Sequence, residues 1–321
     1  LVLLHYNGNA RDPRDDSAPF FAGHWIYFNG ARILTDVPAE DGETDIKVDK
    51  PELFKTEIGR YRRDNEDIGL CELDDKGRPD WSRSEQVQLI AVDARRGVIR
   101  VRRGCYGTKA RAFKANKSYA AAHMTEGPWG RRSHLLWHYN YSTLCPRDAD
   151  GKQASDILSE DMAGQFSETG RLAHFDGIQF DVLSHWKTGG RARGADVDAD
   201  GVADGGVIDG VNVYGIGVIQ FLEGLRSKMG EDRLILADGH GERHQRGFGL
   251  LNGIESEGFP SLSDHELNDW SGGLNRHAFW AANGRVPVFN YINHKFISHG
   301  EIPGDVRKAD VPFSANRLVF A

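Results

Sequence analysis

The chain has 321 residues, of which 39% are hydrophobic, so it is long enough for one sizeable core or for a core with an inserted domain. Its formal net charge of -7 argues against a nucleic-acid-binding protein, which normally carries a basic stripe. No stretch approaches the roughly 18 apolar residues of a membrane span, so we expect no such span. The three widely spaced cysteines offer neither a disulfide framework nor a thiolate metal site, so we expect buried thiols, with a single Cys71–Cys105 bridge as the alternative.

The sequence pattern changes after the first predicted strand. Leu1–Tyr6 is apolar and ends at an Asn-Gly turn, which predicts a buried strand. Between residues 20 and 123, short β-like segments alternate with Gly, Asp and Pro, and a hairpin is predicted over Gln86–Val101. We therefore interpret residues 20–123 as a small antiparallel β domain inserted into a main domain of residues 1–19 and 124–321.

This inserted segment ends in the motif Arg103-Gly104-Cys105-Tyr106-Gly107-Thr108. The motif resembles the VxRGxYGT β modules that recur as accessory pieces in bacterial extracellular and phage-tail-like proteins. The resemblance implies a structural or glycan-facing accessory without chemistry of its own. We accordingly expect a bacterial protein that is extracellular or periplasmic.

From residue 135 onward, predicted strands alternate with predicted helices. The strands are Leu135–Tyr141, Phe175–Leu183, Leu234–Ala237, Leu250–Glu257, Pro287–Asn293 and Arg317–Ala321, and the helices are Ala154–Ser167, Tyr214–Met229 and Glu266–Ala282. The alternation predicts βα units with right-handed crossovers. With Leu1–Tyr6 the strands number seven, so we predict a TIM-type (β/α)8 barrel whose missing first strand precedes Leu1. The alternative is an open doubly wound sheet.

An internal repeat marks the predicted catalytic groups. Asp176-Gly177-Ile178-Gln179-Phe180-Asp181 and Asn252-Gly253-Ile254-Glu255-Ser256-Glu257 both read polar-Gly-Ile-x-x-acid. We expect Asp181 and Glu257 in equivalent layers at the C-terminal mouth of the barrel, where catalytic side chains collect, with Glu255 one layer deeper. Two such carboxyl groups are what glycosidic bond cleavage requires. The structural alternative is that each acid caps a loop or pairs with an arginine.

Asp176 lies on the other side of the strand from Asp181, so we assign it to structure. Asp238 ends the neighbouring strand and competes for the acid role. Further polar and aromatic groups predicted at the strand ends suit a sugar, whose hydroxyls need hydrogen bonds and whose C–H faces stack on aromatic rings. They are His138, Asn140, His185, Trp186, His240, Asn290, Asn293 and His294. A metal-dependent hydrolase that uses Asp181, Asp238 and His240 is a further reading.

A calcium-like loop follows the Asp181 strand. Residues 196–204 read D-x-D-x-D-G-x-x-D, in which alternate oxygen ligands converge on one hard cation. The predicted ligands are Asp196, Asp198, Asp200, the carbonyl of Val202, and Asp204. Position 12 is Val207 where such loops carry an acid, and Asp209 is the predicted substitute. We expect a structural Ca²⁺, with a solvated acidic turn as the alternative.

The repeat, together with Trp137-His138-Tyr139-Asn140, resembles the (F/Y)DGIxxD, NGIxxE and WxxN strands of glycoside-hydrolase-like TIM-barrel families. The resemblance covers about residues 135–296 and implies that Asp181 and Glu257 are the catalytic pair. We therefore predict a glycoside hydrolase that cleaves a polysaccharide or oligosaccharide, with Asp181 as nucleophile or base and Glu257 as general acid. The alternative is a non-catalytic carbohydrate-binding or scaffold protein on a degenerate barrel.

Overall fold

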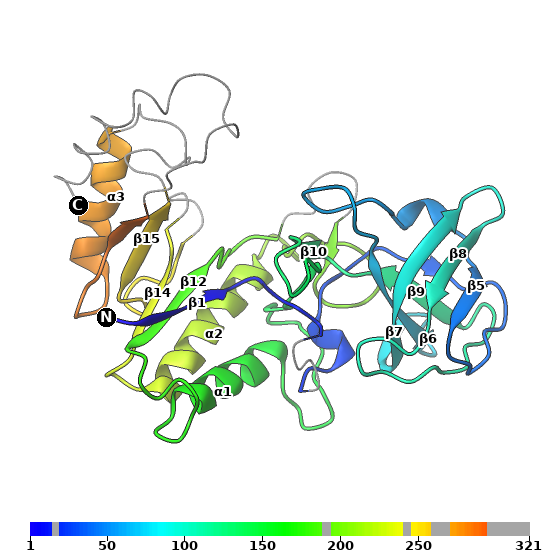
Figure 1. Ribbon diagram of the computed structural model, residues 1–321, viewed down its shortest axis with the longest axis horizontal. Helices are drawn as coiled ribbons and strands as arrows, with labels where there is room; N and C mark the ends of the chain where they lie inside the picture. The colour runs from blue at the N-terminus through cyan, green and yellow to red at the C-terminus, as the bar shows by residue number, and fades with distance from the viewer. Residues whose placement is uncertain (15–18, 188–193, 240–244, 258–269, 294–321) are drawn as a thin grey trace. The chain divides into compact units, whose positions relative to one another are not determined.

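The computed structural model describes residues 1–14, 19–187, 194–239, 245–257 and 270–293 (Figure 1). The chain forms two compact units. Unit 1 comprises Leu1–Gly8, Met162–His185 and Leu222–Ala321, and unit 2 comprises Asn9–Asp161 and Trp186–Phe221. The units divide the chain at other positions than the expected domains, because segments on both sides of the β-rich region cluster with it.

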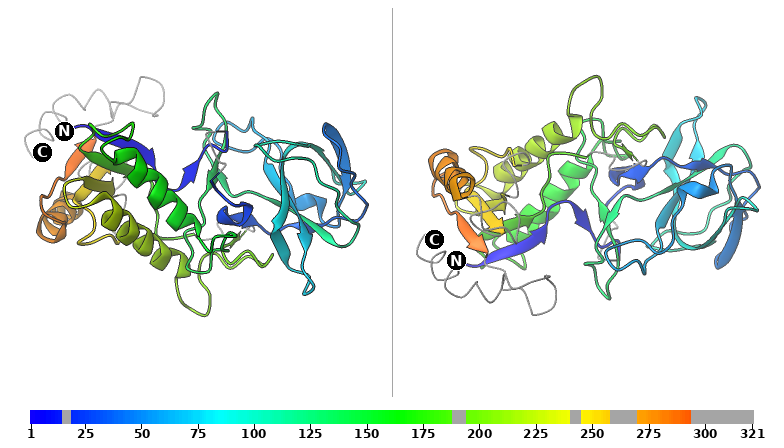
Figure 2. Two further views of the ribbon diagram at one scale, coloured as in Figure 1. Left: turned by 90° about the horizontal axis from the view of Figure 1, so that it is seen from below. Right: turned by 90° about the horizontal axis from the view of Figure 1, so that it is seen from above.

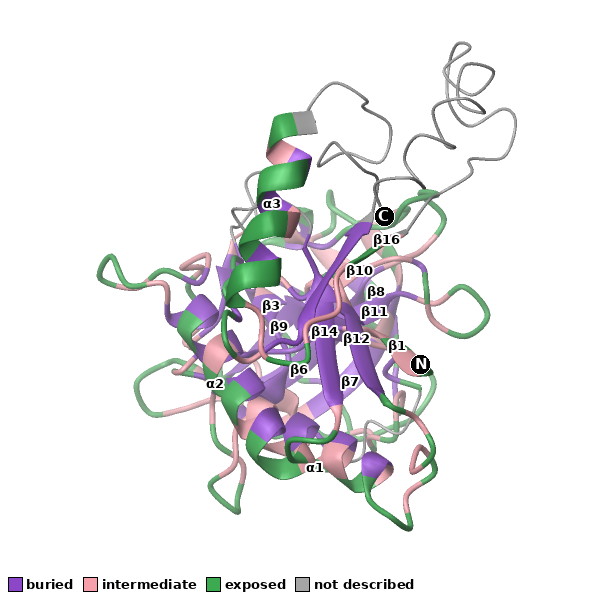
Figure 3. Ribbon diagram, turned by 90° about the vertical axis from the view of Figure 1, so that its left-hand side faces the viewer, coloured by how far each residue is buried: buried purple, intermediate pink, exposed green. Residues whose placement is uncertain are grey.

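An open, five-stranded parallel sheet forms the centre of unit 1. Its strands, in spatial order, are β1 (Leu3–Asn7), β12 (Gly177–Asp181), β14 (Leu234–Asp238), β15 (Gly253–Glu257) and β16 (Tyr291–Asn293). The spatial order follows the chain order, so right-handed crossovers place the connecting helices on one face. Figure 3 shows α3 (Trp270–Asn283) and the unit 1 parts of α1 (Ala154–Phe166) and α2 (Val213–Met229) on one side of the strands.

The predicted closed (β/α)8 TIM barrel is wrong. The described residues form only three α-helices, most of the sheets are antiparallel, and the parallel sheet is open with β1 and β16 at its edges. A doubly wound sheet does not match either, because the strand order never reverses. Leu135–Tyr141 contains β11 (Leu136–His138), which pairs antiparallel with β2 (Ala10–Arg11) and β10 (Thr125–Glu126) instead of joining the parallel sheet. Arg317–Ala321 lies outside the described residues.

The two glycines of the internal repeat allow the parallel strands to approach one another closely. A Cβ atom at Gly177 would lie 2.0 Å from the carbonyl oxygen of Leu234, and one at Gly253 would lie 1.9 Å from that of Phe289. The polar residue before each glycine braces the opposite end of the strand from the acids. Asp176 accepts a hydrogen bond from the backbone N–H of Val2 at 2.6 Å, which agrees with its predicted structural role.

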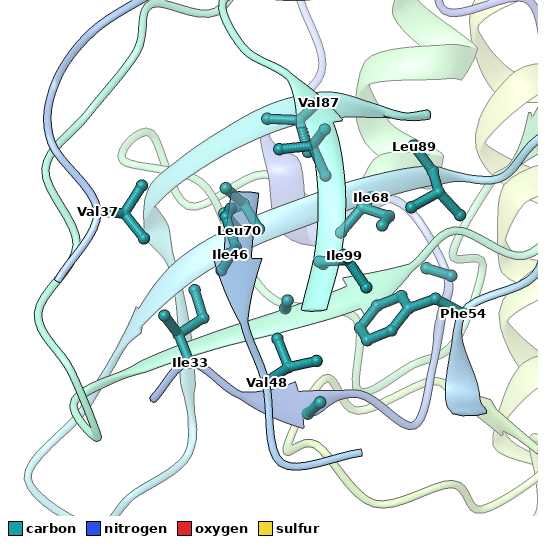
Figure 4. Packing of buried hydrophobic residues seen from close by; sticks show 14 of the residues in the cluster. Ile33, Val37, Ile46, Val48, Phe54, Ile68, Leu70, Val87, Leu89 and Ile99 are labelled. Atoms are coloured by element: carbon teal, nitrogen blue, oxygen red, sulfur yellow. The ribbon is translucent and has the colours of Figure 1, made fainter. Parts of the chain in front are cut away.

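Unit 2 contains the antiparallel β region expected between residues 20 and 123. Its six strands, in spatial order, are β4 (Ala31–Arg32), β9 (Ser118–Ala122), β6 (Asp67–Leu73), β7 (Pro79–Asp93), β8 (Val98–Arg102) and β5 (Glu43–Lys47). Alternate side chains of these strands form a fully buried core that includes Ile68, Val87 and Ile99 (Figure 4). Two further views show this sheet, coloured blue to green (Figure 2).

The remaining elements of unit 2 are short. β3 (Tyr27–Phe28) pairs antiparallel with β13 (Ala195–Asp196), and 3-10 helices lie at Ala22–His24 and Pro51–Leu53. The β3–β13 pair joins the start of the calcium-like loop (residues 196–204, called the acidic loop below) to the β region. Within the described part of the chain, no helix is long and apolar enough to cross a membrane.

Candidate functional site: a carboxylate row and an acidic loop

Three neighbouring strands of the parallel sheet end in acidic residues of one register row. Phe180 pairs with Ala237, so the next residues, Asp181 and Asp238, are level, and Asp238 in turn pairs with Glu255. Side chains at matching register positions of parallel strands point to the same face. The sheet therefore brings Asp181, Asp238 and Glu255 to one face at its carboxyl edge. We call these three acids the carboxylate row.

The members of the row differ in their surroundings. Glu255 is 3% exposed, and its Oε2 accepts a hydrogen bond from the hydroxyl of Tyr291 at 2.9 Å. Asp238 is also buried. The side chain of Asp181 is 32% exposed, and its Oδ2 lies 3.7 Å from Nε2 of His5. One end of the row is thus open to a substrate, while the other is fixed within the protein.

The register changes the expected partner of Asp181. Glu255 is level with Asp181, whereas Glu257 lies two residues further along β15 and pairs with Asn293 of β16. In the register of the sheet, Glu255 and not Glu257 is therefore the residue level with Asp181. Sequence reasoning missed His5 and Tyr291, although both belong to predicted strands. Their alternation along the strands could have identified them, because it places both residues on the same face of the sheet as the acids.

Two predicted sugar-binding residues, His138 and Asn140, belong to unit 2 and not to the parallel sheet. Asn140 is fully buried and donates a hydrogen bond to the carbonyl of Val197 at 3.0 Å. His138 lies between two charged groups: its Nδ1 is 2.5 Å from Nζ of Lys187, and its Nε2 is 3.4 Å from Glu126. Both residues make structural contacts inside unit 2, and neither belongs to a strand of the parallel sheet.

Lys187 itself was not predicted. Burial lowers the pKa of Lys187 to about 8, and burial together with the neighbouring Lys187 charge lowers the pKa of His138 well below its ordinary value. The ammonium group lies 5.4 Å from the ring centre of Tyr214. No local sequence pattern distinguishes a buried lysine from an exposed one, so its burial is known only from its tertiary contacts.

The other predicted sugar-binding residues are scattered. His185 is buried, with Nε2 3.0 Å from the side-chain oxygen of Gln245, whereas Trp186 is 40% exposed and belongs to unit 2. The side-chain oxygen of Asn290 accepts a hydrogen bond from the backbone N–H of Ile254 at 3.0 Å and so braces β15. Asn293 ends β16. The predicted residues His240 and His294 lie outside the described residues. Because the predicted metal-dependent triad includes His240, the complete triad is not described either.

The predicted calcium loop brings three of its acids together. Carboxylate oxygens of Asp196, Asp198 and Asp204 lie within 4.8 Å of one another. The carboxylate of Asp196 also accepts hydrogen bonds from the backbone N–H groups of Asp200 at 3.2 Å and Gly201 at 2.8 Å. Burial, reinforced by the charges of Asp198 and Asp200, raises the pKa of Asp196 to about 8. A cation would relieve this repulsion, and the hard oxygen donors suit a hard cation.

The other three predicted ligands, Asp200, Val202 and Asp209, are not members of this cluster. The N–H of Val202 donates to the carboxylate of Asp200 at 2.8 Å, which tightens the turn. Asp209, the proposed substitute for position 12, is not a member of the acidic cluster found among the described residues, and its φ of 51° places it in a turn of its own.

Comparison with known proteins leaves the chain without a family assignment. No family model matches it, and no curated protein matches it. The resemblance to glycoside-hydrolase-like families therefore rests on its short motifs.

Proposed function

We propose that the chain is a glycoside hydrolase that cleaves a polysaccharide or oligosaccharide with carboxyl groups at the edge of the parallel sheet. The observation that carries the proposal is the carboxylate row, in which three neighbouring parallel strands end in Asp181, Asp238 and Glu255. Binding sites in parallel α/β sheets gather at the carboxyl ends of the strands. Glycoside hydrolysis needs one carboxylate that is ionised and one carboxylic acid that donates a proton.

The spacing of the strands supports this chemistry. Neighbouring strands lie about 4.8 Å apart and residues follow one another at about 3.3 Å along a strand, so the Cα atoms of Asp181 and Glu257, two strands and two residues apart, are about 12 Å apart. Side chains that lean toward each other across this gap reach the roughly 6.5–9.5 Å of inverting enzymes. Adjacent acids such as Asp181 and Asp238 come near the roughly 5 Å of retaining enzymes.

The surroundings of the acids support a division of roles. Asp181 is the most accessible of the row, and a protonated His5 would stabilise its anion, so we assign Asp181 as nucleophile or base. Glu255 is 3% exposed, and the hydroxyl of Tyr291 holds its carboxyl group in place, so we give Glu255 a positioning role. We keep Glu257 as the acid, with Asp238 as its competitor.

Substitution of each acid tests these roles. Asp181→Asn should abolish cleavage of glucan, xylan, mannan and chitin. Glu257→Gln should slow polysaccharide cleavage by about 10²–10⁴-fold yet spare dinitrophenyl glycosides, whose leaving group needs no proton. Asp238→Asn tests the competing assignment in the same two assays, and Asp176→Asn is the matched control at the opposite end of β12. If Asp181→Asn and Glu257→Gln both cleave like the parent, the assignment is wrong.

One observation favours the alternative, a non-catalytic carbohydrate-binding protein. The parallel sheet is open, with β1 and β16 at its edges, so the described strands do not enclose a substrate. That alternative predicts that the parent chain binds these polysaccharides without releasing any reducing ends.

We also propose that the acidic loop holds a structural Ca²⁺. The carboxylates of Asp196, Asp198 and Asp204 would supply its ligands, since they already converge. A bound cation would neutralise charges that otherwise repel one another, and so would fix the loop to the β region through β13. The ion would order the loop and take no part in the cleavage.

A further inference from the structure

Two neighbouring turns of unit 2 concentrate positive charge. Residues 59–63 read Gly-Arg-Tyr-Arg-Arg and residues 127–133 read Gly-Pro-Trp-Gly-Arg-Arg-Ser, so together they hold five arginines and no acidic residue. The whole chain, in contrast, has a formal net charge of -7. The turns therefore form a positive region on a chain that is acidic as a whole. We call residues 59–63 and 127–133 the arginine patch.

Backbone hydrogen bonds hold the two turns of the patch beside each other. An antiparallel bridge closes residues 58–64 into the first turn. The N–H of Gly130 donates to the carbonyl of His134 at 2.9 Å and closes the second turn. The N–H of Arg60 donates to the carbonyl of Gly127 at 2.9 Å and so joins the first turn to the second. The patch is therefore built on two segments that are far apart in the sequence but in contact in the fold.

The two aromatic rings of the patch are open to solvent. Tyr61 is 58% exposed and Trp129 is 51% exposed, whereas aromatic residues of a core are buried. The guanidinium carbon of Arg60 lies 5.5 Å from the ring centre of Trp129, which is a cation–π contact between the two turns. The patch therefore presents apolar ring surface to a ligand directly beside positive charge.

Most of the positive charge of the patch is not neutralised by the protein. Elsewhere in unit 2, Arg78 pairs with Asp74 at 3.2 Å and Arg100 pairs with Asp45 at 2.7 Å. Within the part of the chain that the structure describes, four exposed arginines of the patch form no ion pair with a carboxylate: Arg60, Arg62, Arg63 and Arg132. A guanidinium group offers parallel N–H donors that match a carboxylate or a sulfate. The patch can therefore bind an anion without first breaking an ion pair of its own.

The mixture of rings and charges favours one class of polyanion. In an acidic polysaccharide, the C–H face of a sugar stacks on an aromatic ring while the carboxylate or sulfate on the same sugar reaches a neighbouring guanidinium. Along the first turn, Tyr61 lies between Arg60 and Arg62, which is the alternation that such a ligand requires. A nucleic acid carries a phosphate at every nucleotide and is bound by a basic surface that spans many of them, which the net charge of -7 opposes.

We propose that the arginine patch binds an acidic polysaccharide through Arg62, Arg63 and the exposed ring of Trp129. The patch belongs to unit 2 and includes no member of the carboxylate row, which belongs to unit 1. Binding at the patch therefore does not depend on the proposed hydrolase activity. It gives unit 2 a role of its own, as the part of the chain that attaches to an acidic glycan.

Calorimetric titration of the full chain tests the proposal, in an Asp181→Asn background so that no probe is cleaved. The acidic probes are a hyaluronan octasaccharide and a galacturonate octamer, and the comparison probes are neutral cellohexaose and a thymidine dodecanucleotide. At least one acidic probe should bind, and less tightly as NaCl is raised, because salt screens exposed charges. Arg62→Gln/Arg63→Gln should weaken that binding about tenfold or more by removing two charge-assisted contacts. Trp129→Ala should weaken it about tenfold by removing one ring face.

Arg32→Gln/Arg78→Gln is the matched control. It removes the same charge from two exposed arginines of unit 2 that lie beside the turn after β6, whereas the patch lies before the start of β6. The control should bind as tightly as the parent. The proposal is overturned if neither acidic probe binds, or if cellohexaose or the oligonucleotide binds as tightly as the better acidic probe. It is also overturned if the Arg62/Arg63 variant binds like the control, or if Trp129→Ala leaves the affinity unchanged. These outcomes keep their meaning even if the parent chain cleaves no glycan.

Discussion

The β region depends on one ion pair that is fully buried. Glu85 and Arg103 are each 0% exposed at the side chain, and they form two bonds, Nε to Oε1 at 2.8 Å and Nη2 to Oε2 at 2.5 Å. Arg103 also donates to the carbonyls of Pro38 at 3.0 Å and Arg111 at 2.6 Å. Substituting Arg103→Met removes all four bonds and leaves the Glu85 carboxylate buried without its counter-charge.

The expected cost follows from this geometry. Removing one partner of a buried pair typically destabilises a protein by about 3–5 kcal/mol, because the remaining charge is uncompensated. Two backbone N–H groups, those of Gly104 and Arg111, still donate to Glu85, each at 3.0 Å, so we expect about 4 kcal/mol and not more. With a urea slope of about 2 kcal/mol/M, the unfolding midpoint of unit 2 should fall by about 2 M.

Urea unfolding followed by near-ultraviolet circular dichroism measures this shift. Arg100→Met is the control, since Arg100 belongs to the neighbouring β8 and pairs with Asp45 at 2.7 Å, but the side chains are 50% and 39% exposed. That exposed pair should contribute less than about 1 kcal/mol. The double variant Glu85→Leu/Arg103→Met should recover much of the loss, because no buried charge remains. Equal midpoints for Arg103→Met and Arg100→Met would refute the reasoning.

Four further predictions have defined outcomes. Gly177→Ala should destabilise unit 1 by about 1–3 kcal/mol, whereas Gly164→Ala on α1, with open space around it, should be neutral or stabilising; thermal melts compare the two. Burial raises the pKa of Asp67 to about 6, compared with about 3.9 in the unfolded chain, so the stability of the protein should fall as pH rises from about 4 to about 6. Thermal melts of Asp67→Asn should not show this dependence of the melting temperature on pH. Saturating Ca²⁺ at about 100 times its dissociation constant should stabilise the parent by about 2.7 kcal/mol but leave the melting temperature of Asp196→Asn unchanged. Tyr291→Phe should lower kcat about tenfold with an unchanged melting temperature, and an unchanged kcat would exclude Tyr291 from the site.

Local periodicity predicted most of the elements. The helical stripe over Tyr214–Met229 became α2 (Val213–Met229), and the apolar run Leu234–Ala237 became β14 (Leu234–Asp238). Closure of the sheet was not predictable in the same way, because it depends on which strands pair. Leu135–Tyr141 shows the difficulty: its buried Trp137 and Tyr139 look the same in a parallel strand as in an antiparallel one.

The cavity of about 490 Å³ in unit 2 was harder to foresee. Trp25, Trp81 and Trp137 are far apart in the chain, and each is predicted by its hydrophobicity to belong to a core. Their gathering around a cavity follows from the pairing of β11 with β2 and from the length of β7. A pattern that is local in sequence carries no trace of such an arrangement.

The internal repeat and the strand registers place the acids on the same face of the sheet, but they differ in which residues of the two strands lie level with each other. The repeat equates Phe180 with Ser256, whereas the strand registers place Ile254 level with Phe180. The difference is two residues, and an even shift keeps a side chain on its face. Glu255 thus shares a register row with Asp181, and Glu257 lies two residues beyond that row along β15. The Glu255→Gln and Glu257→Gln variants therefore distinguish which of these two positions a bound substrate contacts.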